Sequence, residues 1–112
     1  MSAGTYNLFI DQGSDFAIQL TVKEDGSAKD LTGYSARAQL RSTKSATDVT
    51  ATFTCTVTNA SGGVIKMALG NSITKDISPG VYYYDLELHT ISDAYVTRIL
   101  EGQATVSQEV TR

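Results

Sequence analysis

Three side chains capable of acid–base or metal chemistry occupy every second position near the end of the 112-residue chain. They are Asp85, Glu87 and His89, within the segment PGVYYYDLELHT. In a strand this spacing places them on one face, about 7 Å apart. A metal site needs three or more convergent ligands, whereas a row along one strand diverges unless a neighbour adds more. His89 is the only histidine. This acid–histidine row is therefore interpreted as a solvated sheet face, with a metal or acid–base site as the alternative.

Cys55, the only cysteine, is a second candidate for chemistry, as a nucleophile with His89 as its base. No third group that would orient the imidazole is evident. Cys55 also alternates in phase with Phe53 and Val57, which favours a small buried side chain. Sequence motifs of serine hydrolases, phosphate-binding loops and dinucleotide sites are missing from the chain. We therefore expect no enzymatic activity, no catalytic residues, no cofactor and no metal.

Composition narrows the class of protein further. The length and a hydrophobic fraction of 41% predict a single folded domain over residues 1–112. The formal net charge is −3 and the nine basic residues are scattered, so a nucleic-acid partner is not expected. The start of the chain, MSAGTYNLFIDQGS, has neither a basic cluster nor a long apolar run. It predicts neither a signal peptide nor a membrane anchor.

Alternation of apolar and polar residues runs through most of the chain, and this period predicts half-buried strands. Turn-forming segments such as EDGSAKD and NASGG separate the runs. The expected strands cover residues 5–11, 15–23, 34–42, 49–58, 64–69, 81–90 and 95–107. The side chains expected in the core are Phe16, Leu20, Leu40, Phe53, Tyr82, Leu86 and Leu100. Seven short strands favour an all-β, immunoglobulin-like antiparallel β-sandwich.

Four positions carry more specific structural expectations. The segment GNSITKDISPG, residues 70–80, is expected to cross between strands as one or two helical turns. Ser72 would cap these turns and Pro79 would stop them. Tyr82 follows a loop and is expected to form a hydrogen bond back across the corner. Gly102 is expected to mark a bulge or bend in the long last strand.

The first strand has apolar residues on both faces. Tyr6, Leu8 and Ile10 share one face, while Phe9 interrupts the polar residues of the other. A strand covered on both sides has this pattern. Phe9 is therefore expected under a loop of its own chain or against a neighbouring subunit, and residues 1–14 are predicted to be a docking arm or an edge strand. The candidate partner interface comprises Tyr6, Leu8, Phe9, Ile10, Tyr83 and Tyr95.

Four short motifs follow one another along the chain. Gln12–Gly13 precedes a strand, and Asp30–Tyr34 (DLTGY) precedes a strand with outward arginines. Gly80–Leu86 and Glu101–Val106 follow. The segments that contain them are YNLFIDQGSDFAIQLTVKEDG, DLTGYSARAQLRS, SPGVYYYDLEL and VTRILEGQATVSQEVTR. Together they resemble a family of small bacteriophage virion proteins. The family includes the N-terminal domains of baseplate upper proteins and related tail-fibre-associated proteins. The resemblance spans nearly the whole chain.

The resemblance implies an immunoglobulin-like module that attaches to other virion proteins and has no catalytic residues. The leading prediction is a tail-side adaptor at the baseplate, neck or fibre attachment, oligomeric within the particle. One alternative is a capsid decoration, or cement, protein. Another is a host-surface carbohydrate-binding module that uses Tyr83 and Tyr95 as an aromatic platform. Baseplate upper proteins continue into long fibrous regions, whereas this sequence stops at Arg112, so a free-standing module is expected. It would be made in the bacterial cytoplasm and located in the virion.

Overall fold

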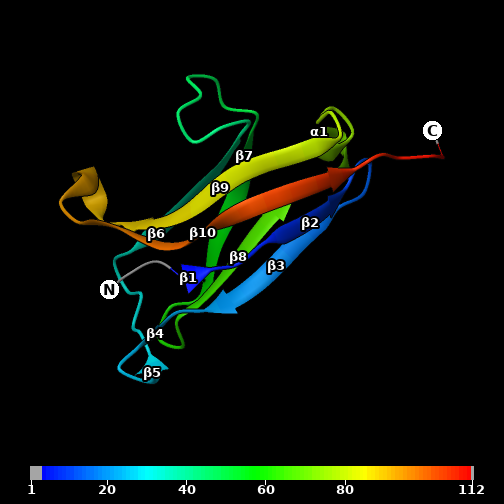
Figure 1. Cartoon of the computed structure of the whole chain (residues 1–112). Helices are drawn as coiled ribbons and strands as arrows, with labels where there is room; N and C mark the ends of the chain where they lie inside the picture. The colour runs from blue at the N-terminus through cyan, green and yellow to red at the C-terminus, as the bar shows by residue number, and fades with distance from the viewer. Residues whose placement is uncertain (1–3, 112) are drawn as a thin grey trace.

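The chain is described by a computed structural model over residues 4–111, which form a curled β-structure with very little helix (Figure 1). Seven strands of these residues are at least four residues long, the number expected from the alternation. The strands are β1 (Gly4–Thr5), β2 (Leu8–Asp11), β3 (Phe16–Thr21), β4 (Lys23–Glu24), β5 (Ser27–Ala28), β6 (Ser35–Arg41), β7 (Ala51–Asn59), β8 (Val64–Leu69), β9 (Gly80–His89) and β10 (Val96–Ser107). The helical segments are α1 (Asn71–Thr74) and the 3-10 turn η1 (Ile91–Asp93). Neither of these two segments, the only helical ones in residues 4–111, could reach across a bilayer.

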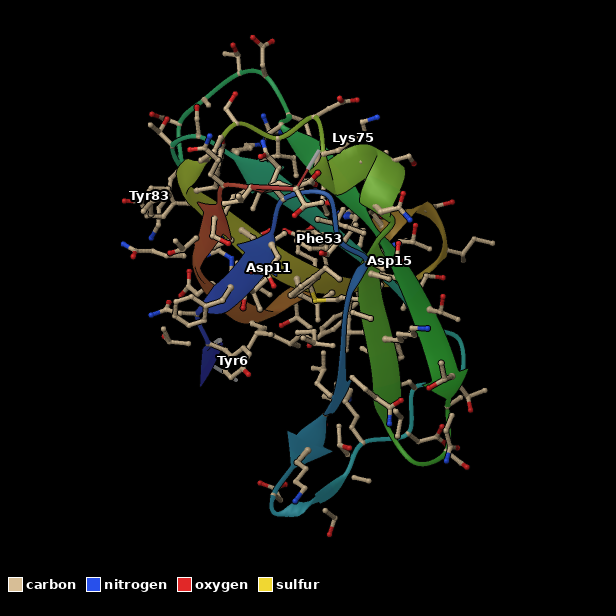
Figure 2. All side chains as sticks on the ribbon, turned by 90° about the vertical axis from the view of Figure 1, so that its right-hand side faces the viewer. Tyr6, Asp11, Asp15, Phe53, Lys75 and Tyr83 are labelled. Atoms are coloured by element: carbon tan, nitrogen blue, oxygen red, sulfur yellow. The ribbon has the colours of Figure 1, made fainter. Side chains whose placement is uncertain are left out.

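The strands form one ladder that bends into two layers. Its order is β1/β2–β10–β9–β6–β7–β8–β3, and β4 and β5 form a separate hairpin. Residues 51–53 of β7 pair with β6, whereas residues 54–59 pair with β8. The larger layer contains β1, β2, β10, β9 and β6, and the smaller layer contains β8 and β3. Figure 2 shows Phe53 of β7 between the two. The fold is therefore all-β and sandwich-like, with one short helical crossover, as predicted.

The core lies between the layers and confirms the predicted phase of the central strands. Leu40, Phe53 and Leu86 are at most 4% exposed. The ring of Phe53 meets Phe16 edge-on, with centroids 6.3 Å apart, and Tyr84 at 6.2 Å. Such tilted ring pairs contribute beyond the area that they bury. The central aromatic cluster therefore joins β3 of the smaller layer to β9 of the larger.

Four residues predicted in the core are only partly buried and pack against its margin: Phe16, Leu20, Tyr82 and Leu100. Phe16 and Leu20 lie on β3, which ends the smaller layer and has a neighbour on one side only. A side chain on such a strand is covered less completely than one on a central strand. Tyr82 keeps its hydroxyl near the surface, where it donates to the carbonyl oxygen of Ser78 at 2.6 Å. This bond is the predicted one across the corner.

The irregularity of β10 is displaced from its predicted position. The register against β9 shifts between Arg98 and Leu100, so Ile99 is the extra residue of a bulge and takes an inward position. The expectation that Gly102 forms the bulge is wrong, because Gly102 pairs in register with Tyr84. Glycine is needed at this position because another segment of backbone passes close to it. A Cβ atom there would clash with the carbonyl group of Tyr6, whose carbon would lie 2.9 Å away.

The N-terminal strand lies at the edge of the larger layer. β1 and β2 both pair with β10 in parallel, an exception to the predicted antiparallel arrangement, and residues 6–7 cross over Gly102 between them. Leu8 and Ile10 point into the core and are at most 2% exposed, whereas Phe9 is 75% exposed. Phe9 therefore does not pack under its own chain. Its other predicted environment, contact with a neighbouring subunit, stays a prediction.

The Gln12–Gly13 turn holds the end of β2 against the crossover. The side-chain amide of Gln12 donates to the carbonyl oxygen of Ile77 at 2.9 Å. Gly13, at φ 85°, donates its backbone N–H to the hydroxyl of Thr74 at 3.1 Å. Thr74 is fully buried and donates in turn to the carbonyl oxygen of Ser14 at 2.8 Å. A polar group at full burial is stable only with such partners.

The helical crossover is capped differently from the prediction. Gly70, not Ser72, occupies the N-cap position, and it has no side chain to accept the free backbone N–H groups. Asp15, the residue before β3, supplies the acceptor instead. Its Oδ1 accepts from the backbone N–H of Asn71 at 2.7 Å and from the Asn71 side chain at 2.9 Å. The cap thus comes from a residue 56 positions away, which no local pattern reveals.

The DLTGY motif is a turn that plugs one end of the core. Asp30 Oδ1 accepts from the backbone N–H of Thr32 at 3.0 Å and from its hydroxyl at 2.6 Å. These bonds lower the pKa of Asp30. Gly33 adopts φ 85°, a conformation that glycine reaches at little cost. Leu31, at the centre of the turn, is 1% exposed. The motif therefore positions a core side chain.

Candidate functional site

The acid–histidine row lies on the outer face of the larger layer, and side chains of other segments balance its charge. Arg37 of β6 lies beside Glu87, with Nε 2.9 Å from Oε1, and 3.3 Å from Asp93 of η1. Arg98 of β10 lies 3.3 Å from the carboxylate of Asp85. Nδ1 of His89 lies 3.6 Å from Asp93. The row is part of a cross-strand ladder of opposite charges.

The electrostatics of this ladder agree with its partly solvated position. Burial raises the pKa of Asp85; the neighbouring Glu87 and Glu101 add to the effect, and Arg98 and Arg41 oppose it. The hydrogen bond to Glu87 raises the pKa of Arg37. Within residues 4–111, no three His, Cys, Asp or Glu side chains converge on a point where a metal ion would fit. The geometry supports a charged surface and provides no set of ligands.

Cys55 has the environment of a structural thiol. It lies on the inward-facing phase of β7, is partly buried, and its Sγ lies 3.9 Å from the carbonyl oxygen of Phe53. Burial raises the pKa of the thiol to about 11. The reactive thiolate is therefore scarce at neutral pH. His89 faces outward on β9, on the other side of the larger layer, so the two residues do not form a nucleophile–base pair.

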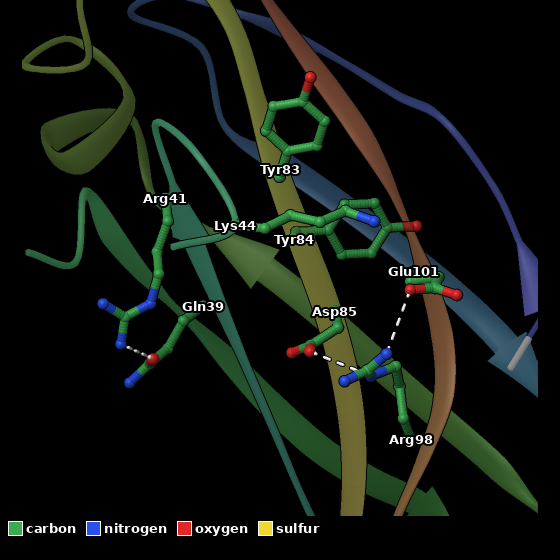
Figure 3. A pocket seen from close by; sticks show the side chains of 8 residues that line it. All are labelled: Gln39, Arg41, Lys44, Tyr83, Tyr84, Asp85, Arg98 and Glu101. Carbon is green, nitrogen blue, oxygen red and sulfur yellow. Dashed lines mark hydrogen bonds and ion pairs between the residues drawn. The ribbon is translucent and has the colours of Figure 1, made fainter. Parts of the chain in front are cut away.

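A shallow hollow of about 180 Å³ opens on the outer face above β6, β9 and β10 (Figure 3). Its lining residues are Gln39, Arg41, Lys44, Tyr83, Tyr84, Asp85, Arg98 and Glu101. On one side Arg98 bridges the carboxylates of Asp85 and Glu101, both at 3.3 Å. On the other side Arg41 and Lys44 have no carboxylate within 4.0 Å among the described residues. The hollow thus has one neutralised side and one cationic side.

Next to this hollow lies a short row of exposed apolar side chains. Thr105 of β10 pairs with Phe9 of β2 on one side and with Val81 of β9 on the other. Phe9 is 75% exposed and Val81 is 51% exposed. Adjacent strands are about 4.8 Å apart, so the two apolar side chains are about 10 Å apart. Tyr83 follows Val81 on the same face and pairs with Arg41 of β6. We call Phe9, Thr105 and Val81 the outer apolar row.

The structure separates the six residues predicted to contact a partner. Phe9 and Tyr83 lie on the same outer face. Leu8 and Ile10 belong to the domain's own core and present no surface for a partner. Tyr6 is 54% exposed at the crossing over Gly102. Whether any of the six binds a partner stays a prediction.

Tyr95 lies at the opposite end of β9 from Tyr83. It packs edge-on against Tyr34, with ring centroids 6.0 Å apart. Val96 pairs with His89, six residues along β9 from Tyr83. At about 3.3 Å per residue, the two tyrosines are about 20 Å apart. They do not form one aromatic platform, so the carbohydrate-binding alternative loses the feature that motivated it.

Three residues of this surface were not singled out from the sequence as interface candidates: Val81, Arg41 and Lys44. Val81 alternates in phase with Tyr83, so its outward position was visible in the pattern. Its proximity to Phe9 was not, because that depends on β2 pairing with β10 in parallel, about 95 residues along the chain. Arg41 and Lys44 are close in the sequence, but basic residues scattered along the chain gave no reason to single them out. Their lack of carboxylate partners is a property of the folded chain.

Comparisons with known proteins reveal a shared fold. No family model matches the sequence, and no curated protein sequence matches it either. Among solved structures, the chain is similar to the N-terminal domain of phage TP901-1 ORF48. The TM-score is 0.61 at 12% sequence identity, covering 96% of this chain and 99% of that one. This chain has the fold of a phage protein domain.

A second solved structure, a family 123 glycoside hydrolase from Clostridium perfringens, has a TM-score of 0.43 at 13% identity. The match covers 97% of this chain and 24% of that one. A score this low carries no argument about fold or activity. The similarity to the phage domain, by contrast, extends over essentially the full length of both chains.

Proposed function

We propose that this chain is a non-enzymatic structural module of a bacteriophage particle that acts by docking onto other virion proteins. The observation that carries this proposal is the end-to-end similarity to the N-terminal domain of phage TP901-1 ORF48. The match covers 96% of this chain and 99% of that domain. The sandwich-like fold is compatible with the immunoglobulin-like class that the sequence motifs imply.

The chemistry of the surface supports a binding role over a catalytic one. The acid–histidine row is held in a ladder of partly exposed ion pairs, and Cys55 is a partly buried thiol of raised pKa. The hollow in Figure 3 is lined by side chains from three strands and a loop, but contains no nucleophile beside a base. Exposed apolar side chains on a rigid sheet, in contrast, are what docking requires.

Within the particle, the tail side is the location that we propose. The support is the resemblance of the QG, DLTGY and GVYYYDL motifs to those of baseplate upper proteins. In this chain two of these motifs build specific turns: Gln12–Gly13 anchors the crossover and Asp30–Gly33 plugs the core. The chain is then a tail adaptor at the baseplate, neck or fibre attachment.

Quantitative mass spectrometry of purified particles tests this proposal. A tail adaptor is expected at a copy number that is a small multiple of the tail symmetry, measured against the major tail and capsid proteins. Immunogold labelling should place it on the tail. A copy number in the hundreds with label on the head would instead establish a decoration protein. If the protein is missing from purified particles that contain every other structural protein, the virion role is refuted.

A further inference from the structure

The outer face of the larger layer has two ends that differ in charge balance. At the end near η1, Arg37 and Arg98 lie within 3.3 Å of carboxylates of Glu87, Asp93, Asp85 and Glu101. At the other end, Arg41 and Lys44 have no carboxylate within 4.0 Å in residues 4–111. The arginines at the η1 end are thus paired with carboxylates, whereas the cations at the other end have no close carboxylate among the described residues.

The guanidinium of Arg41 is fixed in place by neutral acceptors. Its Nη1 donates to the carbonyl oxygens of Ala46 at 2.9 Å and Thr47 at 3.1 Å, and its Nη2 donates to Gln39 Oε1 at 2.9 Å. Three of its five donors are used in this way. Two N–H groups, on Nε and Nη2, have no acceptor among the described residues. A carboxylate has two oxygens to accept them, and a charge-assisted pair of this kind is stronger than a neutral one.

Lys44 adds a second positive charge to the same end. It belongs to the loop between β6 and β7, and Figure 3 shows its side chain extending over β9 between Tyr83 and Asp85. The carboxylates of the hollow, Asp85 and Glu101, are already bridged by Arg98. The local excess of charge is therefore positive, although the chain as a whole is acidic at −3. Arg41 interacts with Asp85 only beyond 4.0 Å. An anionic group approaching this end therefore meets two cations that have no close carboxylate among residues 4–111.

The outer apolar row lies directly beside these cations. Arg41 pairs with Tyr83, and Val81 precedes Tyr83 on the same face of β9, about 7 Å away. Phe9 extends the row to the edge of the layer. Interface centres are enriched in aromatic residues and arginine and depleted of other charged residues. Phe9, Tyr83 and Arg41 at this end are residues of these enriched types.

We infer that the outer apolar row, Tyr83, Arg41 and Lys44 form the docking surface for an acidic segment of another virion protein. An apolar residue of that segment covers Phe9 and Val81, and an Asp or Glu side chain accepts from Arg41. This inference rests on the proposed virion role and adds the surface and the chemistry of the partner. Charge complementarity selects the occupant, because Arg41 and Lys44 have no carboxylate within 4.0 Å among the residues that the structure describes.

The first experiment measures incorporation into phage particles that carry the double variant Arg41→Glu with Lys44→Glu. The copy number per particle is expected to fall at least tenfold, since two attractive contacts become repulsive. The matched control is Lys23→Glu with Lys66→Glu, which makes the same change of charge on β4 and β8. Both control residues are exposed, and neither has a carboxylate within 4.0 Å in the described part of the chain. The control variant should be incorporated at the wild-type level.

Phe9→Ser separates docking from folding. Phe9 is 75% exposed, so this variant should melt within about 2 °C of the wild type, as surface substitutions do. Its incorporation should nevertheless fall severalfold. Deleting the whole N-terminal strand would be a weaker test, because Leu8 and Ile10 would be lost from the core. Equal incorporation of wild type, Phe9→Ser and the charge-reversed double variant would overturn the inference.

A photo-crosslinking phenylalanine analogue at position 9, activated in purified particles, identifies the occupant. The expected product joins this chain to a different virion protein at a peptide that contains Asp or Glu. A crosslink to a second copy of this chain, or to a peptide with no acidic residue, would contradict the inference. The outcomes are distinguishable from failure of the proposed function. Absence of the wild-type protein from particles refutes the virion role, whereas normal incorporation of the variants refutes only this surface.

Discussion

Gly102→Ala tests the link between the N-terminal strand and the rest of the sheet. Gly102 lies where residues 6–7 cross over β10, and an added Cβ would overlap the carbonyl group of Tyr6 and lie 3.1 Å from Oδ1 of Asn7. The clash involves backbone, so a side-chain rotation cannot relieve it. Residues 4–8 must therefore move away from β10. Gly102 does not have a positive φ, so the substitution introduces steric overlap and no backbone strain.

Three hydrogen bonds depend on this crossing. Tyr84 donates its hydroxyl to the Tyr6 carbonyl oxygen, Tyr6 donates its N–H to the Glu101 carbonyl oxygen at 2.9 Å, and Gln103 donates its N–H to Asn7 Oδ1 at 3.1 Å. Each contributes about 1 kcal/mol net. Partial loss of the three, with some overpacking, gives a cost of roughly 2–4 kcal/mol. That is a large share of the roughly 5–15 kcal/mol typical of a domain.

Urea denaturation, followed by circular dichroism, measures this difference directly. Gly70→Ala is the matched control, because a Cβ there meets nothing within 4 Å and the residue has φ −73°. Its cost should be about 0.5–1 kcal/mol, because alanine is a poorer N-cap residue than glycine, and should therefore stay below that of Gly102→Ala. Amide hydrogen exchange should also accelerate in β2 of the Gly102 variant while β7 and β8 keep their protection.

Combination with Tyr84→Phe provides a further check on the mechanism. That substitution removes the hydroxyl that donates to Tyr6 and should itself cost about 1 kcal/mol. If Gly102→Ala already breaks this bond, the double variant should be less destabilised than the sum of the single variants, by about 1 kcal/mol. A Gly102→Ala cost below about 0.5 kcal/mol, the range of ordinary surface substitutions, would refute the account of a tight crossing.

Three other expectations follow from the same structure. Phe53→Ala should lower the free energy of unfolding by about 3–5 kcal/mol, since the ring is 4% exposed. The control Thr54→Ala, at an exposed position of the same strand, should stay within about 0.5 kcal/mol, and a small loss for Phe53→Ala would mean that the core is assigned wrongly. Replacing the acid–histidine row with serine should leave particle incorporation near normal, and tight zinc or calcium binding by calorimetry that this variant loses would contradict the assignment as a solvated face. Cys55 should react slowly with a thiol reagent at pH 8 and faster as the pH approaches its raised pKa of about 11, because the thiolate is the nucleophile. Rapid reaction of the folded protein at pH 8 would contradict the partial burial of the thiol.

The alternation of the sequence was sufficient to predict the central strands and their faces. In β9, Leu86 points into the core and Glu87 points out, as the period of two requires. The same reasoning failed where the ladder is irregular. The bulge at Ile99 changes the phase of β10, so Leu100 moves to the margin. A bulge consists of backbone hydrogen bonds to a neighbouring strand, and the neighbour is not visible in a local window.

Contacts between distant segments limited the prediction of the site in the same way. Phe9 could be identified because an aromatic residue on a polar face needs an explanation. Its neighbour Val81 is 72 positions away and becomes adjacent only through Thr105. Tyr83 and Tyr95 show the opposite case: they are close in the sequence but lie near opposite ends of β9, so they do not form one aromatic platform. The sequence also did not indicate which cations have a carboxylate partner, because Glu87 and Asp93 come close to Arg37 only in the folded chain.

Two of the motifs that resemble phage proteins build turns of the fold. Gln12 and Gly13 anchor a turn, Asp30 and Gly33 shape another, and none of them belongs to the inferred docking surface. The inferred docking surface, in contrast, shares positions with two other motifs: Val81 and Tyr83 lie in Gly80–Leu86, and Thr105 lies in Glu101–Val106. Phe9, Arg41 and Lys44 complete the surface from other strands and a loop. If these residues select the partner, exchanging only the outer apolar row, Tyr83, Arg41 and Lys44 between two such domains should exchange their docking partners and leave both folds intact.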